Sequence, residues 1–569
     1  MELREKLLFN LLVIFVTAIV VIVYILPIFT YKENDPETMD PLLAVGYLEE
    51  ARSQGVPLRE FFASSSLFDD VKREDPKQSF DYPRKHFHFE WMSLSTPAIN
   101  LAYLPFVRLF GVSSDTIAIY SNFYCILTFC IVALLALLAY GKWCSLLSVA
   151  FLSSSLVWLI HVKVGGMQWM PSVLLCSILV LFLFLYLKHN SSVWLVLSGA
   201  SLGLLYLTGW ISFPFGALIL GLGFVMGTFT RKSRSFLDAL LLATSVFFTI
   251  CVISAIYAIR YKCSLWDIHL AIFDCLIGRF FQGGVPGVTL SILGKISYAF
   301  KCMFIDMTQY DHLDKCLEGT SAVSGFFTLS FIVGLFYTFK SRQLSDRCML
   351  LWFFCVFSVL CTVYLYAHRY AIMGLPAAAI IAARGVEQAG RQIYSSKYRQ
   401  MFWPTVVIMV FLTVQNVSST YTHYYSDYMF HKAPNYEIDR MRGHVAFSNW
   451  LKTNCQQNKT LVVLGDPVMF AHTCFLFNTF SSPYRFIYWN NHFSGSSSPS
   501  SVLDWEKGQL NTYDKIVFSF STKLLGNRDG NSFFNDWRPF IAAHPNIRPV
   551  FEYSYDGRSP YFVVFVVSK

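Results

Sequence analysis

Two aspartates near the start of the chain have the chemistry and the position of a catalytic base. Asp35 and Asp40 lie in an acidic stretch, residues 31–41, that follows an apolar N-terminal segment. From about Leu42 to Gln54, apolar residues recur four apart, which is typical of a helix lying on a membrane surface. A carboxylate at the start of such a helix could meet a lipid-borne donor and a soluble acceptor and accept a proton there. The alternative is a solvated acidic linker, which is the simpler interpretation of any single carboxylate here.

A second group of polar residues lies further along the same segment. Arg84 and Lys85 precede His86, His88 and Glu90. In a strand, the last three side chains point to one face, and two imidazoles with a carboxylate can hold a divalent metal ion. The alternative is a band of histidine and aromatic residues at a membrane surface. The two basic residues are candidates for binding a lipid phosphate, or are ordinary surface charges.

The composition of the 569-residue chain indicates where these residues act. Hydrophobic residues make up 54% and charged residues only 14%, whereas soluble proteins carry about 25% charged residues. This excludes a soluble monomer, a disordered protein and a coiled coil, and it predicts a polytopic α-helical membrane protein. The net charge of +9 is spread over short loops, so no nucleic-acid partner is expected. No CxxC pair occurs among the cysteines, which disfavours zinc and thioredoxin-like sites.

Eleven apolar stretches are long enough to cross a bilayer, which takes roughly 17–25 residues. The first lacks a clear cleavage site and is interpreted as a retained helix rather than a signal peptide. The stretches are about 7–30, 114–141, 144–163, 167–187, 192–209, 211–229, 236–259, 323–340, 348–366, 370–388 and 402–422.

The short loops on one side of this arrangement are all basic, as expected for the cytoplasmic side. The basic residues are Lys142, Lys188, Arg231, Lys232, Arg234, Lys340, Arg342, Arg347, Arg384, Arg391, Lys397 and Arg399. The N-terminus is therefore predicted to be cytoplasmic. A transmembrane domain is predicted over 1–425, with long outer loops at 31–113 and 261–322, and an extracytoplasmic soluble domain over 426–569.

The tail changes from long apolar runs to short alternating elements. A small α/β domain is predicted. A serine-rich loop, Ser496–Ser501, is interpreted as a linker. The expected strands are Thr460–Leu464, Arg485–Trp489, Ile516–Ser519, Phe551–Tyr555 and Phe562–Val567, with helices at Pro467–Phe477 and Phe533–Ala543 and a hairpin turn at Asp556–Gly557.

Three segments of the chain resemble motifs of one family. The likeness in order and spacing covers residues 1–230 and 365–425. Residues Ser95–Gly111 (STPAINLAYLPFVRLFG) are similar to the "HPPLYYLLLALWLKLFG" segment of the polyprenyl-phosphate-sugar glycosyltransferases of the GT-C superfamily. These include the dolichyl-phosphate-mannose–protein mannosyltransferases and the aminoarabinose transferases that act on lipid A. The stretch from Asp40 to Gly55 resembles their "DE–A–Y–A–LL–GG" segment, and Arg369–Pro376 resembles their "RYLLPLLP" helix.

The chain departs from the family pattern at two positions. The family's Asp-Glu pair is Asp40-Pro41 here, and its His-Pro-Pro or Lys-Pro-Pro is Ser95-Thr96-Pro97, so a basic residue is missing. Arg84 or Lys85 could replace it. The WWDYG-type motif of oligosaccharyltransferases is absent from the sequence.

The resemblance implies an integral membrane glycosyltransferase that moves one sugar, with inversion, from a polyprenyl-phosphate donor to an acceptor hydroxyl on the outer face. It implies Asp40 as the base, with Asp35 second. Cations near the leaving phosphate would stabilise the transition state, and the candidate donor-binding residues are Arg84, Lys85, Arg279, Arg369 and Tyr370. The donor is already activated, so no cofactor is expected apart from the candidate metal. The acceptor would be a glycan, a lipid or a protein.

The competing function is a transporter or flippase of similar span number. Such proteins usually show inverted repeats, broken helices and charges at the membrane midplane, and no internal repeat is evident. The last residues, Val567-Ser568-Lys569, contain no retention signal, which favours a bacterial inner membrane over the endoplasmic reticulum.

Overall fold

The structure is a computed structural model whose described residues cover most of the chain. They are 2–26, 36–64, 93–111, 114–164, 166–209, 212–230, 235–281, 291–305, 323–341, 343–362, 371–395, 400, 402–422, 446–447, 449–455, 459–464, 484–488, 498–521, 539–553 and 562–569.

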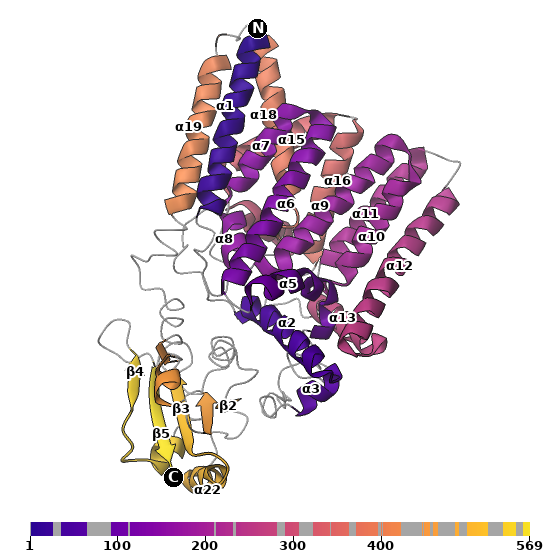
Figure 1. Ribbon diagram of the computed structural model, residues 1–569. Coiled ribbons are helices and arrows are strands. Elements are labelled where there is room, and N and C mark those ends of the chain that lie inside the picture. Colours follow the sequence, from indigo (N-terminus) through magenta and orange to yellow (C-terminus); the bar gives the residue numbers. More distant parts are fainter. Residues whose placement is uncertain are drawn as a thin grey trace.

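Most of these residues form helices, which Figure 1 shows as a bundle with the chain's N-terminus at one end. Each of the eleven predicted apolar stretches overlaps a helix. The matching helices are α1 (Glu2–Val20) with the π-helix η1 (Val21–Ile25), α6 (Ser114–Tyr140), α7 (Lys142–Ser153) with α8 (Leu156–Val164), α9 (Gly166–His189), α10 (Ser192–Tyr206), α11 (Ser212–Thr230), α12 (Ser235–Tyr261), α15 (Gly325–Lys340), α16 (Leu344–Thr362), α18 (Leu375–Ser395) and α19 (Phe402–Tyr421).

Four of the described helices are long and apolar enough to cross a membrane, and a bent pair would make five. Several others are apolar but shorter, among them α10 and α15. The molecule therefore has the helices of a polytopic membrane protein, while the number of eleven spans stays a prediction.

The stretch predicted as one span at 144–163 is instead broken. Helices α7 and α8 meet at an angle of 68°, and the break falls in the serine run Ser153–Ser155. The hydroxyl of Ser153 donates to the Ala150 carbonyl at 3.3 Å, and that of Ser154 donates to the Phe151 carbonyl at 3.2 Å. Such local bonds compete with the helix ladder and bend it, a signal that apolar length alone does not carry.

The predicted outer loops contain helices of their own. The first holds α2 (Pro36–Gln54), α3 (Leu58–Ser64) and α5 (Pro97–Phe110); the second holds α13 (Leu265–Phe281), α14 (Ile292–Phe300) and the π-helix η2 (Lys301–Ile305). Helix α2 starts at Pro36, earlier than the predicted Leu42, because proline is well suited to the first helical position. Figure 1 shows α2, α3 and α13 at the end of the bundle opposite the N-terminus.

Paired glycines bring two long helices together. A Cβ on Gly334 of α15 would collide with the Ile381 carbonyl oxygen of α18, and one on Gly385 would lie 2.5 Å from the Gly334 nitrogen. Small residues of this kind let helix backbones approach closely inside a membrane. The same relation joins α10 to α12, where a Cβ on Gly203 would lie 2.9 Å from the Val246 oxygen.

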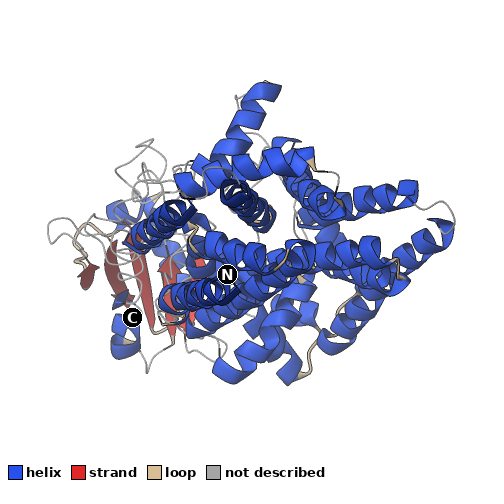
Figure 2. Ribbon diagram, turned by 90° about the horizontal axis from the view of Figure 1, so that it is seen from above, coloured by secondary structure: helices blue, strands red, loops and turns tan. Residues whose placement is uncertain are grey.

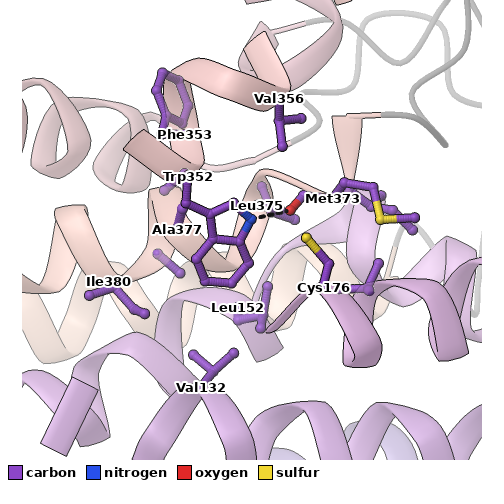
Figure 3. Packing of buried hydrophobic residues seen from close by; sticks show 14 of the residues in the cluster. Val132, Leu152, Cys176, Trp352, Phe353, Val356, Met373, Leu375, Ala377 and Ile380 are labelled. Atoms are coloured by element: carbon purple, nitrogen blue, oxygen red, sulfur yellow. Dashed lines mark hydrogen bonds between the residues drawn. The ribbon is translucent and has the colours of Figure 1, made fainter. Parts of the chain in front are cut away.

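The main core lies where α16 and α18 meet α6, α7 and α9. Figure 3 shows Trp352 at its centre, packed among Val132, Leu152 and Cys176 from three other helices. Its indole nitrogen donates to the Met373 carbonyl at 3.1 Å. The buried tryptophan therefore has its polar atom paired, as buried indoles usually do.

Buried carboxylates tie helices together at the end of the bundle nearest the N-terminus. Asp346 of α16 accepts a hydrogen bond from the Tyr140 hydroxyl at 2.8 Å and lies 3.8 Å from Nε of Arg384. Asp238 of α12 accepts from Tyr186 at 2.7 Å and from Ser192 at 3.2 Å. Each buried acid thus joins elements that are distant in the sequence.

The C-terminal residues form a five-stranded mixed sheet with the order β2-β1-β3-β5-β4. Strands β1 and β3 are parallel, with Val462 opposite Val517, and β5 is antiparallel to β3, with Phe518 opposite Phe565. Figures 1 and 2 show the strands gathered at one side of the helices. The strands are β1 (Thr460–Leu464), β2 (Tyr484–Tyr488), β3 (Lys515–Ser521), β4 (Phe551–Tyr553) and β5 (Phe562–Ser568).

All five predicted strand positions hold a strand, but the prediction of a linker at Ser496–Ser501 was wrong. Ser498 caps a helix, α22 (Pro499–Leu510), and its side chain accepts a hydrogen bond from the Ser501 amide. Serine at the N-cap followed by proline is a standard helix start. Of the predicted helix 533–543, the described part, residues 539–543, is helical. The predicted helix at Pro467–Phe477 and the turn at Asp556–Gly557 lie outside the described residues.

Candidate active site

Helix α2 is held against the bundle by an apolar stripe. Tyr47, Leu48 and Ala51 follow the three- and four-residue spacing of one helix face, and together with Leu42 and Val45 they are fully buried or nearly so. They share a core cluster with residues of α5, α6, α12 and α13. The predicted interfacial helix is therefore packed on protein along this face, so its position relative to the bundle is fixed.

A carboxylate on the same helix adds directional contacts. Glu49 Oε1 accepts hydrogen bonds from Arg260 at 2.7 Å and from the Tyr261 hydroxyl at 3.0 Å. Glu49 Oε2 accepts from Arg108 at 3.1 Å and from Arg52 at 3.2 Å. This cluster of five residues, called the Glu49 cluster below, links α2 to α5 and to the end of α12.

The Glu49 cluster keeps its carboxylate charged. Partial burial alone would raise the pKa of Glu49, but the hydrogen bonds from Arg260, Arg108 and Tyr261 outweigh it, so the pKa is lowered. Near the end of the same helix, Lys262 donates to the Gly55 carbonyl at 2.6 Å. These contacts could not be predicted from the sequence because their partners lie far apart in the chain.

The two candidate bases lie at the other end of α2. Asp40 is within the helix, nine residues before Glu49, which is about 14 Å along a helix axis. Asp35 directly precedes Pro36, the first residue of α2, and lies outside the described residues. Asp40 therefore depends on the anchored helix α2 for its position.

Residues Ser95-Thr96-Pro97, which stand where the family has His-Pro-Pro, lie buried against the backbone at Leu207 and Gly209. We call this contact the junction beneath α5. Pro97 opens α5, and the Ala98 amide donates to the Leu207 carbonyl at 3.0 Å. Gly209 has a φ of +61°, and a Cβ there would collide with the carbonyl oxygen of Ser95. Ser95 and Thr96 are both buried, so their side chains offer no exposed surface for a phosphate.

A buried amide continues this junction into α12. Asn100 Nδ2 donates to the Ser93 carbonyl at 2.9 Å and lies 3.1 Å from the Tyr257 hydroxyl. Tyr257 donates to the same carbonyl at 2.6 Å. These bonds join α5 and α12 one turn away from Arg260 and Tyr261, so the Glu49 cluster and this junction together form one support for α2.

Three of the candidate donor-binding residues belong to or adjoin described elements in the sequence. Arg279 belongs to α13, whose side-chain positions are described only as far as Leu276. Arg369 and Tyr370 lie just outside the described residues, immediately before the Ala371–Gly374 turn. That turn is held by Trp352, so the backbone that follows Arg369 and Tyr370 is fixed.

The remaining candidates, Arg84 and Lys85 with His86, His88 and Glu90, lie outside the described residues. Within the part of the chain that the structure describes, no group of three His, Cys, Asp or Glu side chains could hold a metal ion. The proposed metal ligands thus stay a prediction from the sequence.

No protein-family model and no curated protein matches the sequence. Similar solved structures do exist. ArnT from Cupriavidus metallidurans bound to undecaprenyl phosphate is 12% identical with a TM-score of 0.59, and the match covers 97% of each chain. The oligosaccharyltransferase of Archaeoglobus fulgidus in its apo form is 12% identical with a TM-score of 0.55, over 92% of this chain and 71% of that one.

A further structure of the archaeal enzyme, AglB from Archaeoglobus fulgidus with an inhibitory peptide and a dolichol-phosphate, gives a TM-score of 0.50 at 12% identity, over 91% of this chain and 70% of that one. The chain therefore shares its fold with ArnT and with the archaeal oligosaccharyltransferase.

Proposed function

We propose that the protein is an integral membrane glycosyltransferase that moves one sugar from a polyprenyl phosphate to an acceptor hydroxyl. The observation that carries this proposal is the likeness to ArnT over 97% of both chains, because that structure holds undecaprenyl phosphate. The anchored helix α2 supports it, since α2 carries Asp40 at the end of the bundle where the sheet lies (Figure 1).

In the proposed reaction, the acceptor oxygen attacks the anomeric carbon from the face opposite the phosphate. The bond between that carbon and the phosphate oxygen breaks, and its electron pair leaves with the polyprenyl phosphate. The acceptor proton passes to Asp40, or to Asp35 if that residue is the base. One displacement inverts the anomeric carbon, and no nucleotide or redox cofactor takes part.

Negative charge grows on the lipid phosphate as it leaves, so cations placed there lower the barrier. We assign this role to Arg84, Lys85, Arg279 and Arg369, with Tyr370 as a further donor contact. Arg279 belongs to α13, and Arg369 stands two residues before the Ala371–Gly374 turn in the sequence.

We propose that the active site faces away from the cytoplasm, on the periplasmic side of a bacterial inner membrane. The support is the basic character of the loops on the N-terminal side. The acceptor, a glycan, a lipid or a protein, would approach from the side that carries the C-terminal sheet.

The test is sugar transfer in proteoliposomes with a panel of radiolabelled polyprenyl-phosphate sugars. Wild type is expected to transfer at least one sugar, and Asp40→Asn is expected to bind the donor without transferring it. If only Asp35→Asn is inactive, Asp35 is the base. If wild type transfers nothing from any donor, the proposal fails, and solute or lipid transport in the same vesicles becomes the next measurement.

A further inference from the structure

We infer that Glu49 is a positioning residue, which sets the place of the base by fixing helix α2 against α5 and α12. This inference rests on the proposed function, because it concerns a carboxylate at the N-terminal end of α2. It applies equally to Asp40 and Asp35, since the first belongs to α2 and the second directly precedes it.

The Glu49 cluster uses both oxygens of one carboxylate in different directions. Oε1 is bound by Arg260 and Tyr261 from the end of α12, while Oε2 is bound by Arg108 from α5. Charge-assisted bonds of this kind are short and directional. A shift of α2 in any direction would therefore lengthen at least one of them.

The apolar stripe of α2 cannot do this alone. Burial is non-directional and depends on area, so Leu42, Val45 and Leu48 hold the helix down but allow small slides along its axis. The Glu49 cluster lies near the C-terminal end of the helix, with the Lys262 bond to Gly55 just beyond it. These bonds set the axial position, and a stiff helix passes it on to Asp40.

A base is sensitive to such a slide, because it must lie within hydrogen-bond reach of the acceptor proton. A misplacement of about 1 Å can cost roughly 100-fold in rate. Loss of the Glu49 cluster is therefore expected to slow the chemical step far more than it weakens donor binding, since the proposed donor contacts are on other segments.

The experiment compares Glu49→Gln with Glu50→Gln in proteoliposomes. Glu50 is the matched control, because it is the next carboxylate on the same helix and its side chain bonds to Gln54 of that helix at 2.8 Å. For Glu49→Gln, kcat is expected to fall roughly 10- to 100-fold while the donor KM changes less than about twofold. For Glu50→Gln, both constants should stay within about twofold of wild type.

Two further variants separate positioning from simple loss of stability. Glu49→Asp keeps the charge but withdraws it by one methylene, so kcat should fall while the melting temperature stays close to that of wild type. Arg260→Gln should reproduce the kcat loss, and adding Glu49→Gln to it should cost little more, because the two groups share one interaction.

Three results would overturn the inference. One is a wild-type kcat in Glu49→Gln or Glu49→Asp. Another is a donor KM that rises as much as kcat falls, and the third is a fall in activity that follows the melting temperature across all variants. An inactive wild type would instead refute the proposed function, which is a distinguishable outcome.

Discussion

The indole nitrogen of Trp352 donates a hydrogen bond to the Met373 carbonyl at 3.1 Å, and both residues are fully buried (Figure 3). This bond joins α16 to the turn at Ala371–Gly374. In the sequence, Arg369 and Tyr370 directly precede that turn, so the bond fixes the backbone that follows two of the proposed donor contacts. Trp352 thus links the main core to the turn that follows Arg369 and Tyr370 in the sequence.

Replacing Trp352 with phenylalanine should therefore affect donor binding as well as stability. The Met373 carbonyl would be left buried and unpaired, which costs about 1–3 kcal/mol, and the turn would loosen. We expect a lower melting temperature and a raised donor KM, measured by thermal unfolding and by transfer kinetics. Trp266→Phe is the control, since Trp266 is largely exposed on α13; equal effects of the two variants would contradict the expectation.

A buried acid–imidazole pair makes the C-terminal sheet region sensitive to pH. His544 Nε2 lies 2.8 Å from Glu506 Oε2, and His544 Nδ1 lies 3.0 Å from the Phe540 carbonyl oxygen. A carbonyl only accepts, so Nδ1 carries a proton, and a second proton must lie between the imidazole and the carboxylate. Burial raises the pKa of Glu506, although the adjacent His544 acts in the opposite direction.

The sign of the pH effect follows from that raised pKa. The folded state holds the Glu506 proton more tightly than the unfolded state, whose pKa is about 4.3. The stabilisation is complete below the unfolded value and is lost as pH rises through the folded one. Opening of α22, measured by hydrogen exchange corrected for the intrinsic rate, should therefore become easier with rising pH.

Glu506→Gln should flatten this pH dependence, because the amide stays neutral and can still donate to the imidazole. Asp504→Asn is the control, since Asp504 is exposed on the same helix. The expectation fails if Glu506→Gln and wild type respond to pH in the same way.

The helical architecture could be predicted because each membrane helix carries its own signal. Apolar length marks a span regardless of its partners, so all eleven stretches overlap helices. The break between α7 and α8 was missed because the hydroxyls of Ser153 and Ser154 compete with the helix ladder, an effect that hydropathy does not register. The prediction of a linker at Ser496–Ser501 was wrong for a similar reason. Serine caps helices and proline begins them as readily as both residues occur in loops.

The supports of the candidate site could not be predicted from one sequence. Glu49 and Arg260 are 211 positions apart, and nothing local to either indicates the other. The same holds for Asn100 and Tyr257. By contrast, Asp40 was identified by its place after a span and by its resemblance to a family motif, which are both features of the sequence itself.

Chelation tests the candidate metal site at His86, His88 and Glu90. The proposed reaction needs no metal, so transfer should persist in EDTA at the rate seen without it. His86→Ala and His88→Ala should likewise retain activity. Loss of transfer in EDTA, restored by one divalent cation and mimicked by both variants, would show that these residues hold a metal that the reaction needs.

A series of glycine variants tests the junction beneath α5. Gly209 has a positive φ, and a Cβ there would also collide with the Ser95 carbonyl oxygen. Gly111 has a positive φ of +74° but nothing within 4 Å of a Cβ, and Gly221 has open space and no such φ. The three positions therefore separate backbone strain from steric collision.

Alanine at these positions should destabilise the protein in the order Gly209, Gly111, Gly221. Strain alone costs about 1–3 kcal/mol, so Gly111→Ala should lower the melting temperature modestly, and Gly221→Ala should hardly change it. Gly209→Ala adds a displaced backbone and should lower it most. Because Ser95 precedes α5, and α5 supplies Arg108 to the Glu49 cluster, this variant should also lower kcat at temperatures where it remains folded. A Gly209→Ala protein as stable and active as Gly221→Ala would show that the junction is not rigid, and that α5 does not transmit its position to α2.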